Sequence, residues 1–240
     1  MEKNFSDLKF KTGVKDGLPI GLGYLTVSFA FGVQASILNV PIWIAVLISM
    51  TNLTSAGQLA GLGIVAVSGS FIEIIITQLV INSRYFLMST LLSQKTDDSF
   101  TFKHRLLASV AITDEIFAIA VGKPKTISKN YFYGLALLPY VGWTLGTLIG
   151  ATAGQMLPAF VISALGIALY AMFIAIIVPP AMKSLGTLLA IALSAGISCA
   201  FYFIPYLHIS SGFAIIVSAL ISACVIAYFF PIKKEEKNDD

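Results

Sequence analysis

Four ionisable side chains lie inside long apolar stretches of this chain: Glu73, Arg84, Asp114 and Glu115. A charge at membrane depth costs about 3 kcal/mol on insertion scales, so such groups usually face a cavity or a partner and mark transport pathways. Arginine can hold a carboxylate through its planar fork, and a desolvated carboxyl group can carry a proton. These residue types predict a transport or channel function.

The composition places these residues in a membrane. Of the 240 residues, 57% are hydrophobic and 11% are charged, whereas soluble domains carry about 25% charged residues. A chain this apolar cannot cover itself with polar surface, so we predict an all-α polytopic membrane helix bundle. The net charge of +3 comes from Lys and Arg spread over loops and ends, which does not indicate nucleic-acid binding.

Long apolar runs predict six to eight spans, since one helix needs ~20 residues to cross. The runs are 17–38, 41–68, 70–92, 131–153, 157–180, 184–205 and 208–230, with a shorter eighth segment at 105–121. We therefore expect a cytoplasmic N-terminal tail over 1–16, a transmembrane transporter domain over 17–230 and a charged cytoplasmic C-terminal tail over 231–240.

The run 41–68 is interrupted by a polar, glycine-bearing stretch at 51–58. Such an interruption is tolerated at membrane depth only where it is buried in protein or faces a water-filled space. We expect a broken or re-entrant helix here, with a long tilted helix as the alternative. Elsewhere, glycines spaced by four predict close helix packing, and they are Gly142, Gly146, Gly150 and Gly154.

The distribution of basic residues indicates the orientation, because cytoplasmic loops carry an excess of Lys and Arg. Basic residues outside the spans fall in both tails, in the loops before and after 105–121, and at Lys183. If 41–68 and 105–121 each dip in and return, the chain crosses six times and every basic loop is cytoplasmic. If both cross fully, there are eight crossings and the 93–105 loop lies outside. Both arrangements keep the N- and C-termini in the cytoplasm, and we favour the first.

The run 70–92 is the most informative predicted helix. Glu73, Thr77 and Arg84 fall within about 40° of one another on it, and a second polar stripe lies roughly opposite. We therefore expect protein or water around this helix, with Glu73, near its start, reaching the outer interface. Arg84 is either a structural charge that snorkels or pairs, or a fixed charge that binds a substrate carboxylate. Asp114 or Glu115 as its partner fits both alternatives.

Asp114 and Glu115 are adjacent, so on a helix they point about 100° apart and cannot both pair with one arginine. In a low-dielectric site, desolvation favours the protonated form of at least one of them, which makes a proton-coupling role physically reasonable. If 105–121 is an interfacial helix, both carboxylates are solvated and this argument weakens.

No enzyme motif, catalytic residue, metal site or cofactor is expected. The chain has no phosphate-binding glycine loop, and His104 and His208 have no metal-ligand spacing. Cys199 and Cys224 fall in apolar spans, where buried free thiols are expected.

At these same residues the sequence resembles the AzlC-type family, the large subunit of bacterial branched-chain amino acid exporters. The resemblance covers most of 13–230. Its elements are a Gly-Leu-Pro start at 17–19, an Ala-Gly-Gln stretch at 56–58, an Asn-x-Arg element at Asn82-Ser83-Arg84, and a Thr-Asp-Glu-x-Phe element at 113–117. The last two together are fairly specific.

The resemblance implies a transporter of the bacterial cell (plasma) membrane that exports leucine, isoleucine or valine with the proton motive force. It also implies a small hydrophobic AzlD-type membrane subunit as partner. We expect substrate-binding roles for Gln58, Asn82, Arg84 and Tyr85, and proton-coupling roles for Asp114 and Glu115. Export of another small zwitterionic metabolite, or a non-transporting membrane assembly subunit, are the alternatives.

Overall fold

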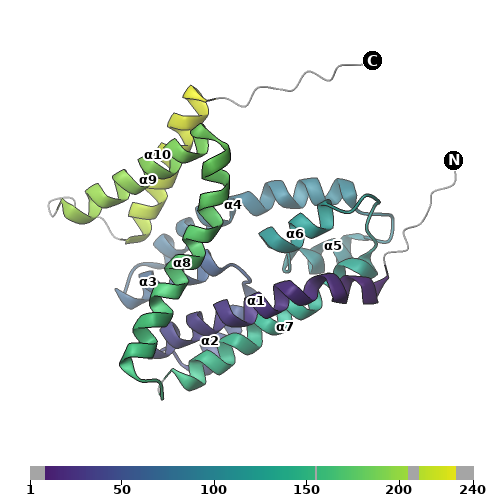
Figure 1. The fold of residues 1–240 in the computed structure, drawn as a ribbon, viewed down its shortest axis with the longest axis horizontal. Coiled ribbons are helices and arrows are strands. Elements are labelled where there is room, and N and C mark those ends of the chain that lie inside the picture. Colours follow the sequence, from purple (N-terminus) through teal and green to yellow (C-terminus); the bar gives the residue numbers. More distant parts are fainter. Residues whose placement is uncertain (1–8, 155, 205–210, 231–240) are drawn as a thin grey trace. The chain divides into compact units, whose positions relative to one another are not determined.

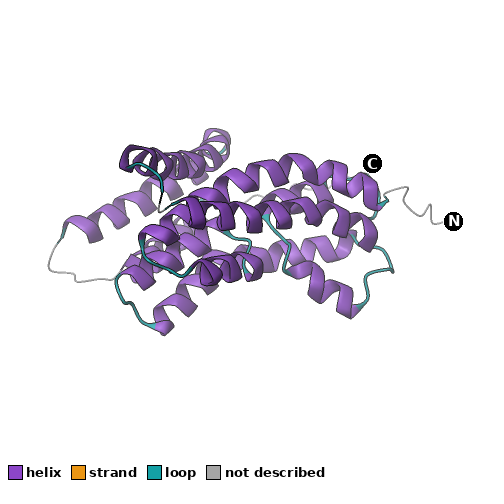
Figure 2. Ribbon diagram, turned by 90° about the horizontal axis from the view of Figure 1, so that it is seen from below, coloured by secondary structure: helices purple, strands orange, loops and turns teal. Residues whose placement is uncertain are grey.

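Every regular element in the described part of the chain is a helix (Figure 2). The computed structural model describes residues 9–154, 156–204 and 211–230. The helices there are α1 (Phe10–Ile37), α2 (Ile42–Thr51), α3 (Ser55–Ala66), α4 (Phe71–Lys95), α5 (Phe102–Ser109), α6 (Asp114–Val121), α7 (Lys129–Ala153), α8 (Ala159–Lys183), α9 (Leu185–Phe203) and α10 (Ser211–Phe229). They confirm the all-α class. The chain divides into two compact units, one formed by 1–62 and 81–169 and the other by 63–80 and 170–240.

Five helices of the described residues are long and apolar enough to cross a membrane: α1, α4, α7, α9 and α10. They fall on five of the predicted runs. The 25-residue helix α8 covers the run predicted at 157–180, and at ~1.5 Å per residue it also exceeds the ~30 Å of a bilayer core. The first helix begins at Phe10 rather than Gly17, so part of the expected N-terminal tail is helical. The predicted C-terminal tail over 231–240 lies outside the described residues.

Helices α1 and α7 pack side by side and in parallel (Figure 1). Gly13 near the start of α1 faces Tyr131 at the start of α7, and Gly150 near the end of α7 faces Phe29. A Cβ atom added at Gly150 would overlap the Phe29 carbonyl, and one added at Gly142 would overlap the Gly21 carbonyl, about two turns earlier in α1. The predicted glycine stripe therefore brings two helices of the same chain into backbone contact.

The run 41–68 is broken, as predicted, because residues 52–54 separate α2 from α3. Asn52 is extended, with φ −146° and ψ 104°. Thr54 starts the new helix, since its Oγ1 accepts from Gly57 N at 3.3 Å and its carbonyl accepts from Gln58 N at 2.9 Å. The Gln58 side chain then reaches back, and its Nε2 donates to the Asn52 carbonyl at 2.7 Å.

The segment 105–121 forms two short helices rather than one apolar run. Helices α5 and α6 have eight residues each and are separated by 110–113. At ~1.5 Å per residue each is about 12 Å long, well short of the ~30 Å hydrocarbon core. Neither can cross a membrane alone. The break also moves Asp114 from the centre of the predicted segment to the first residue of α6.

The first half of helix α4 carries an exposed apolar row opposite its buried polar groups. Ile72, Ile75 and Leu79 are 66%, 58% and 67% exposed. Glu73 and Thr77, on the other side, are buried. A span loses nothing by turning apolar side chains to lipid, whereas its polar groups need protein partners, so only the polar side of this segment faces inward.

The expectation of buried thiols is wrong. Cys199 on α9 and Cys224 on α10 are both free and exposed on the surface of their helices. An apolar residue type predicts burial only where water is the outer solvent, and the outer solvent of a membrane span is lipid.

Candidate functional site

The first turn of α6 carries two carboxylates that face different partners. Thr113 caps the helix, because its Oγ1 accepts from a backbone N–H of that turn at 3.4 Å. Arg84 Nη2 donates to Asp114 Oδ2 at 2.9 Å, and the Tyr24 hydroxyl donates to Glu115 Oε2 at 2.5 Å. Negative charge is also favoured at a helix N-terminus. The prediction that the adjacent carboxylates cannot share one arginine is confirmed.

The Arg84 guanidinium is fixed from two directions. Its Nη2 atom contacts Asp114 and lies 3.4 Å from the Tyr85 hydroxyl, while its Cζ lies 5.1 Å from the centroid of the Tyr85 ring. The Arg84 and Asp114 side chains are 44% and 43% exposed, so the ion pair is accessible at the protein surface. None of the described residues places an acceptor on Nε or Nη1. The N–H groups of Nε and Nη1 are therefore left to bond another carboxylate.

Tyr24 connects this turn to the α1–α7 pair. It is buried, and its hydroxyl lies 2.7 Å from Thr113 Oγ1 as well as beside Glu115. Its ring meets Trp143 of α7 edge to face, with centroids 5.1 Å apart and planes at 69°. The partner of Glu115 is thus anchored between two closely packed helices, which fixes the direction of its hydroxyl.

A buried polar network lies one turn beyond that aromatic pair. Ser28 on α1 and Thr147 on α7 face each other, and Thr147 Oγ1 lies 2.7 Å from Ser49 Oγ on α2. The Ser49 oxygen also accepts from Gln58 Nε2 at 3.2 Å. All four side chains are buried. The network links the α1–α7 pair to the break between α2 and α3.

Two atoms at this network remain without a partner among the described residues: Gln58 Oε1 and Trp143 Nε1. The orientation of the Gln58 amide follows from its contacts, because the Asn52 carbonyl can only accept and so must face the amide nitrogen. Each unsatisfied buried polar group costs about 1–3 kcal/mol. Gln58 Oε1 is therefore an available acceptor at the helix break, and Trp143 Nε1 an available donor beside Tyr24.

The structure brings together four of the predicted site residues: Arg84, Tyr85, Asp114 and Glu115. Asn82 is partly buried one turn before Tyr85 on α4. Gln58 lies in the buried network at the helix break instead.

Sequence reasoning missed several members of the site. Thr113 was identifiable, since a threonine directly before Asp-Glu has the pattern of a helix cap. Tyr24, Ser49 and Thr147 gave no such signal, because single hydroxyls in apolar spans usually bond their own helix. Their contacts come from the α1–α7 packing and the helix break.

Glu73 belongs to the second unit and has a separate structural role. It is only 3% exposed, so it is enclosed by protein, and its place at the outer interface stays a prediction. Its Oε1 accepts from Gly212 N in the first turn of α10 at 2.9 Å. A carboxylate there satisfies a free N–H group and complements the helix dipole. In the described part of the chain, no group of three or more His, Cys, Asp or Glu side chains could hold a metal ion.

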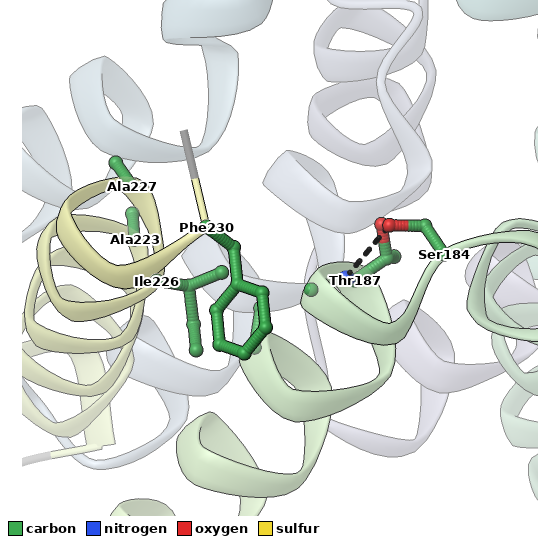
Figure 3. Close-up of a pocket in the computed structure, with 8 residues that line it drawn as sticks. Ser184, Thr187, Ala223, Ile226, Ala227 and Phe230 are labelled. Atoms are coloured by element: carbon green, nitrogen blue, oxygen red, sulfur yellow. Dashed lines mark hydrogen bonds between the residues drawn. The ribbon is translucent and has the colours of Figure 1, made fainter. Parts of the chain in front are cut away.

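The second unit also contains a mostly apolar pocket between the start of α9 and the end of α10 (Figure 3). Phe230 and Ile226 form one side of it. Its polar atoms are engaged in helix capping, because Ser184 Oγ accepts from Thr187 N at 3.3 Å. No ionisable side chain lines it. The pocket therefore lacks the chemistry of the Arg84–Asp114 site.

Comparisons with known proteins identify the family and membrane-protein relatives of the chain. A family model described as AzlC protein matches residues 19–157. An uncharacterized membrane protein of Archaeoglobus fulgidus is 31% identical over 172 residues, which are 71% of this chain and 75% of that protein. The inner membrane protein YgaZ of Escherichia coli is 31% identical over 172 residues, 68% of this chain and 70% of that protein. No solved structure matches the chain. The chain belongs to the AzlC family, a family of membrane proteins with a transport-related role.

Proposed function

We propose that this chain is the large subunit of a secondary transporter that exports leucine, isoleucine and valine, coupled to the proton motive force. Membership of the AzlC family supports transport as the class of function. The observation that carries the proposal is the accessible Arg84–Asp114 pair beside a second carboxylate, Glu115, which Tyr24 holds apart. An arginine with free N–H groups can bind an amino acid carboxylate, and the neighbouring acids can carry a coupling proton.

In this proposal Arg84 binds the substrate carboxylate through the free N–H groups of Nε and Nη1. The Tyr85 ring keeps the guanidinium plane in place. Asn82 on the same helix and Gln58 at the helix break contribute hydrogen bonds. The free acceptor of Gln58 supports its part in binding. Asp114 or Glu115 carries the coupling proton.

The partner in this proposal is a small hydrophobic AzlD-type subunit. Large apolar side chains are exposed on several helices of the chain, including the α4 row, and a second membrane subunit would cover part of this surface. We place the complex in the bacterial cell membrane, in keeping with the name of the Escherichia coli relative, an inner membrane protein.

Both termini are placed in the cytoplasm, because the tails and the loops at 93–105 and 122–130 carry most of the Lys and Arg. A reporter enzyme fused after residue 98 or after residue 126 should report the cytoplasm. A periplasmic signal from the 98 fusion alone would replace this arrangement with eight crossings.

The direct test is the flux of labelled leucine from loaded vesicles that contain this chain with and without its partner subunit. We expect leucine efflux that requires both subunits. Flux of a different zwitterion but not of leucine, isoleucine or valine would favour the alternative, an exporter of another small zwitterionic metabolite. Absence of any flux, with both subunits present and folded, would leave the membrane assembly role.

A further inference from the structure

The Arg84–Asp114 contact is a single-point ion pair, although arginine and carboxylate usually pair through two parallel hydrogen bonds. Only Nη2 and Oδ2 meet. Among the described residues, no acceptor faces Arg84 Nε or Nη1, and no side chain donates to Asp114 Oδ1. Arg84 therefore keeps free N–H groups on Nε and Nη1, Asp114 keeps a free Oδ1, and both side chains are nearly half exposed.

The surroundings hold the Arg84 and Asp114 side chains in place and leave Nε and Nη1 of Arg84 and Oδ1 of Asp114 unoccupied. The Tyr85 ring and hydroxyl contact the guanidinium from its own helix. Asp114 is the first residue of α6, directly after the Thr113 cap. The neighbouring carboxylate cannot take its place on the arginine, because Glu115 is bound by Tyr24. The result is a fixed pair of opposite charges, with free donors on Arg84 and a free acceptor on Asp114.

We propose that a whole α-amino acid zwitterion binds across this ion pair, its carboxylate on the free N–H groups of Arg84 and its ammonium group on Asp114 Oδ1. The dipole of the zwitterion is then antiparallel to that of the ion pair, so each charge has an opposite neighbour. This assignment rests on the proposed function and extends it: the site requires both a free carboxylate and a free amino group. Compounds that lack either group are excluded.

The arrangement also explains how export is coupled to a proton. The ammonium group needs an ionised Asp114, and a proton that binds the same carboxylate neutralises it, so the substrate and the proton compete for one carboxylate. Alternation between them is the requirement for proton–substrate antiport. The titratable and charged groups described around Asp114 are Arg84 and Tyr85 on α4, Glu115 on α6, and Tyr24 on α1 beside Glu115.

The test is competition against labelled-leucine exchange in vesicles that contain the chain and its partner subunit. The competitors are unlabelled leucine, leucinamide, which lacks the carboxylate, and 4-methylpentanoate, which lacks the amino group. One hydrogen bond to a charged group is worth about 1.5–3 kcal/mol, so each analogue should compete about 10- to 150-fold more weakly than leucine. Equal competition by either analogue in the wild-type protein would overturn the assignment.

Two variants one residue apart separate the two carboxylates. In Asp114→Asn, the preference for leucine over 4-methylpentanoate should fall at least tenfold, while the preference over leucinamide persists because Arg84 is intact. In Glu115→Gln, both preferences should persist. An unchanged preference in Asp114→Asn, or an equal loss in both variants, contradicts the assignment. If vesicles with the wild-type protein exchange leucine but do not distinguish it from leucinamide or 4-methylpentanoate, this inference alone fails. If they exchange no leucine, the proposed function fails as well.

Discussion

Replacing Arg84 by lysine keeps the positive charge next to Asp114 but removes the planar fork. In the structure Nη2 of the guanidinium contacts Asp114, and the N–H groups of Nε and Nη1 have no acceptor among the described residues. The single nitrogen of a lysine ammonium group must serve both Asp114 and the substrate carboxylate, whereas the guanidinium keeps separate nitrogens for the substrate. The lost charged hydrogen bond is worth about 1.5–3 kcal/mol, so the half-saturating leucine concentration should rise about 10- to 150-fold. Arg84→Gln should be worse, because the charge is lost too.

The assay is labelled-leucine exchange in vesicles with the partner subunit present and with the amount of folded protein matched. Arg105→Lys is the control, since it makes the same change at the other arginine of the chain, whose Nε donates to the Phe100 carbonyl on the same segment. We expect the half-saturating leucine concentration of this control to stay close to that of the wild-type protein. If Arg84→Lys also transports leucine with wild-type half-saturation, the clamp role is wrong and Arg84 is a structural charge.

Three further changes test parts of the structure. Tyr24→Phe removes the hydroxyl that donates to Glu115, so gradient-driven leucine transport should fall about tenfold or more while the protein stays folded by Tm in detergent; unchanged transport would remove Tyr24 from the site. Gly150→Val forces side-chain atoms into the α1 backbone and should lower stability by about 3 kcal/mol or more, measured as Tm, whereas Gly23→Ala, with open space around it, should have little effect. Glu73→Gln keeps an acceptor for the first turn of α10 and should lower Tm by less than Glu73→Ala, and equal losses would rule out the capping role.

The sequence was sufficient to predict those features that depend only on residues within one segment of the chain. Apolar runs of about 20 residues predicted six of the long helices, since lipid requires that length of helix. The polar stretch before Gln58 predicted the break between α2 and α3, because it removes both the hydrophobicity and the helix propensity of the span. The 100° separation of successive side chains predicted that Asp114 and Glu115 face different partners.

What the sequence did not reveal depends on packing between distant segments. Tyr24 reaches Glu115 only because the parallel contact between α1 and α7 fixes its direction, and no pattern within α1 contains that information. Glu73 was expected at the interface from its place near a helix start, but its partner is a backbone N–H 139 residues away. The exposed thiols on α9 and α10 show the same limit, since residue type alone does not tell a protein-facing position from a lipid-facing one.

The most direct test of proton-coupled export compares gradient-driven accumulation of leucine with leucine exchange in the same vesicles. An amide at Asp114 or Glu115 cannot release a proton, so the variant that replaces the coupling carboxylate should lose accumulation driven by a proton gradient. Exchange at saturating leucine needs no net proton movement and should survive. We expect this split for Asp114→Asn, whose carboxylate pairs with Arg84 at 2.9 Å. Intact gradient-driven accumulation in both Asp114→Asn and Glu115→Gln would contradict the account.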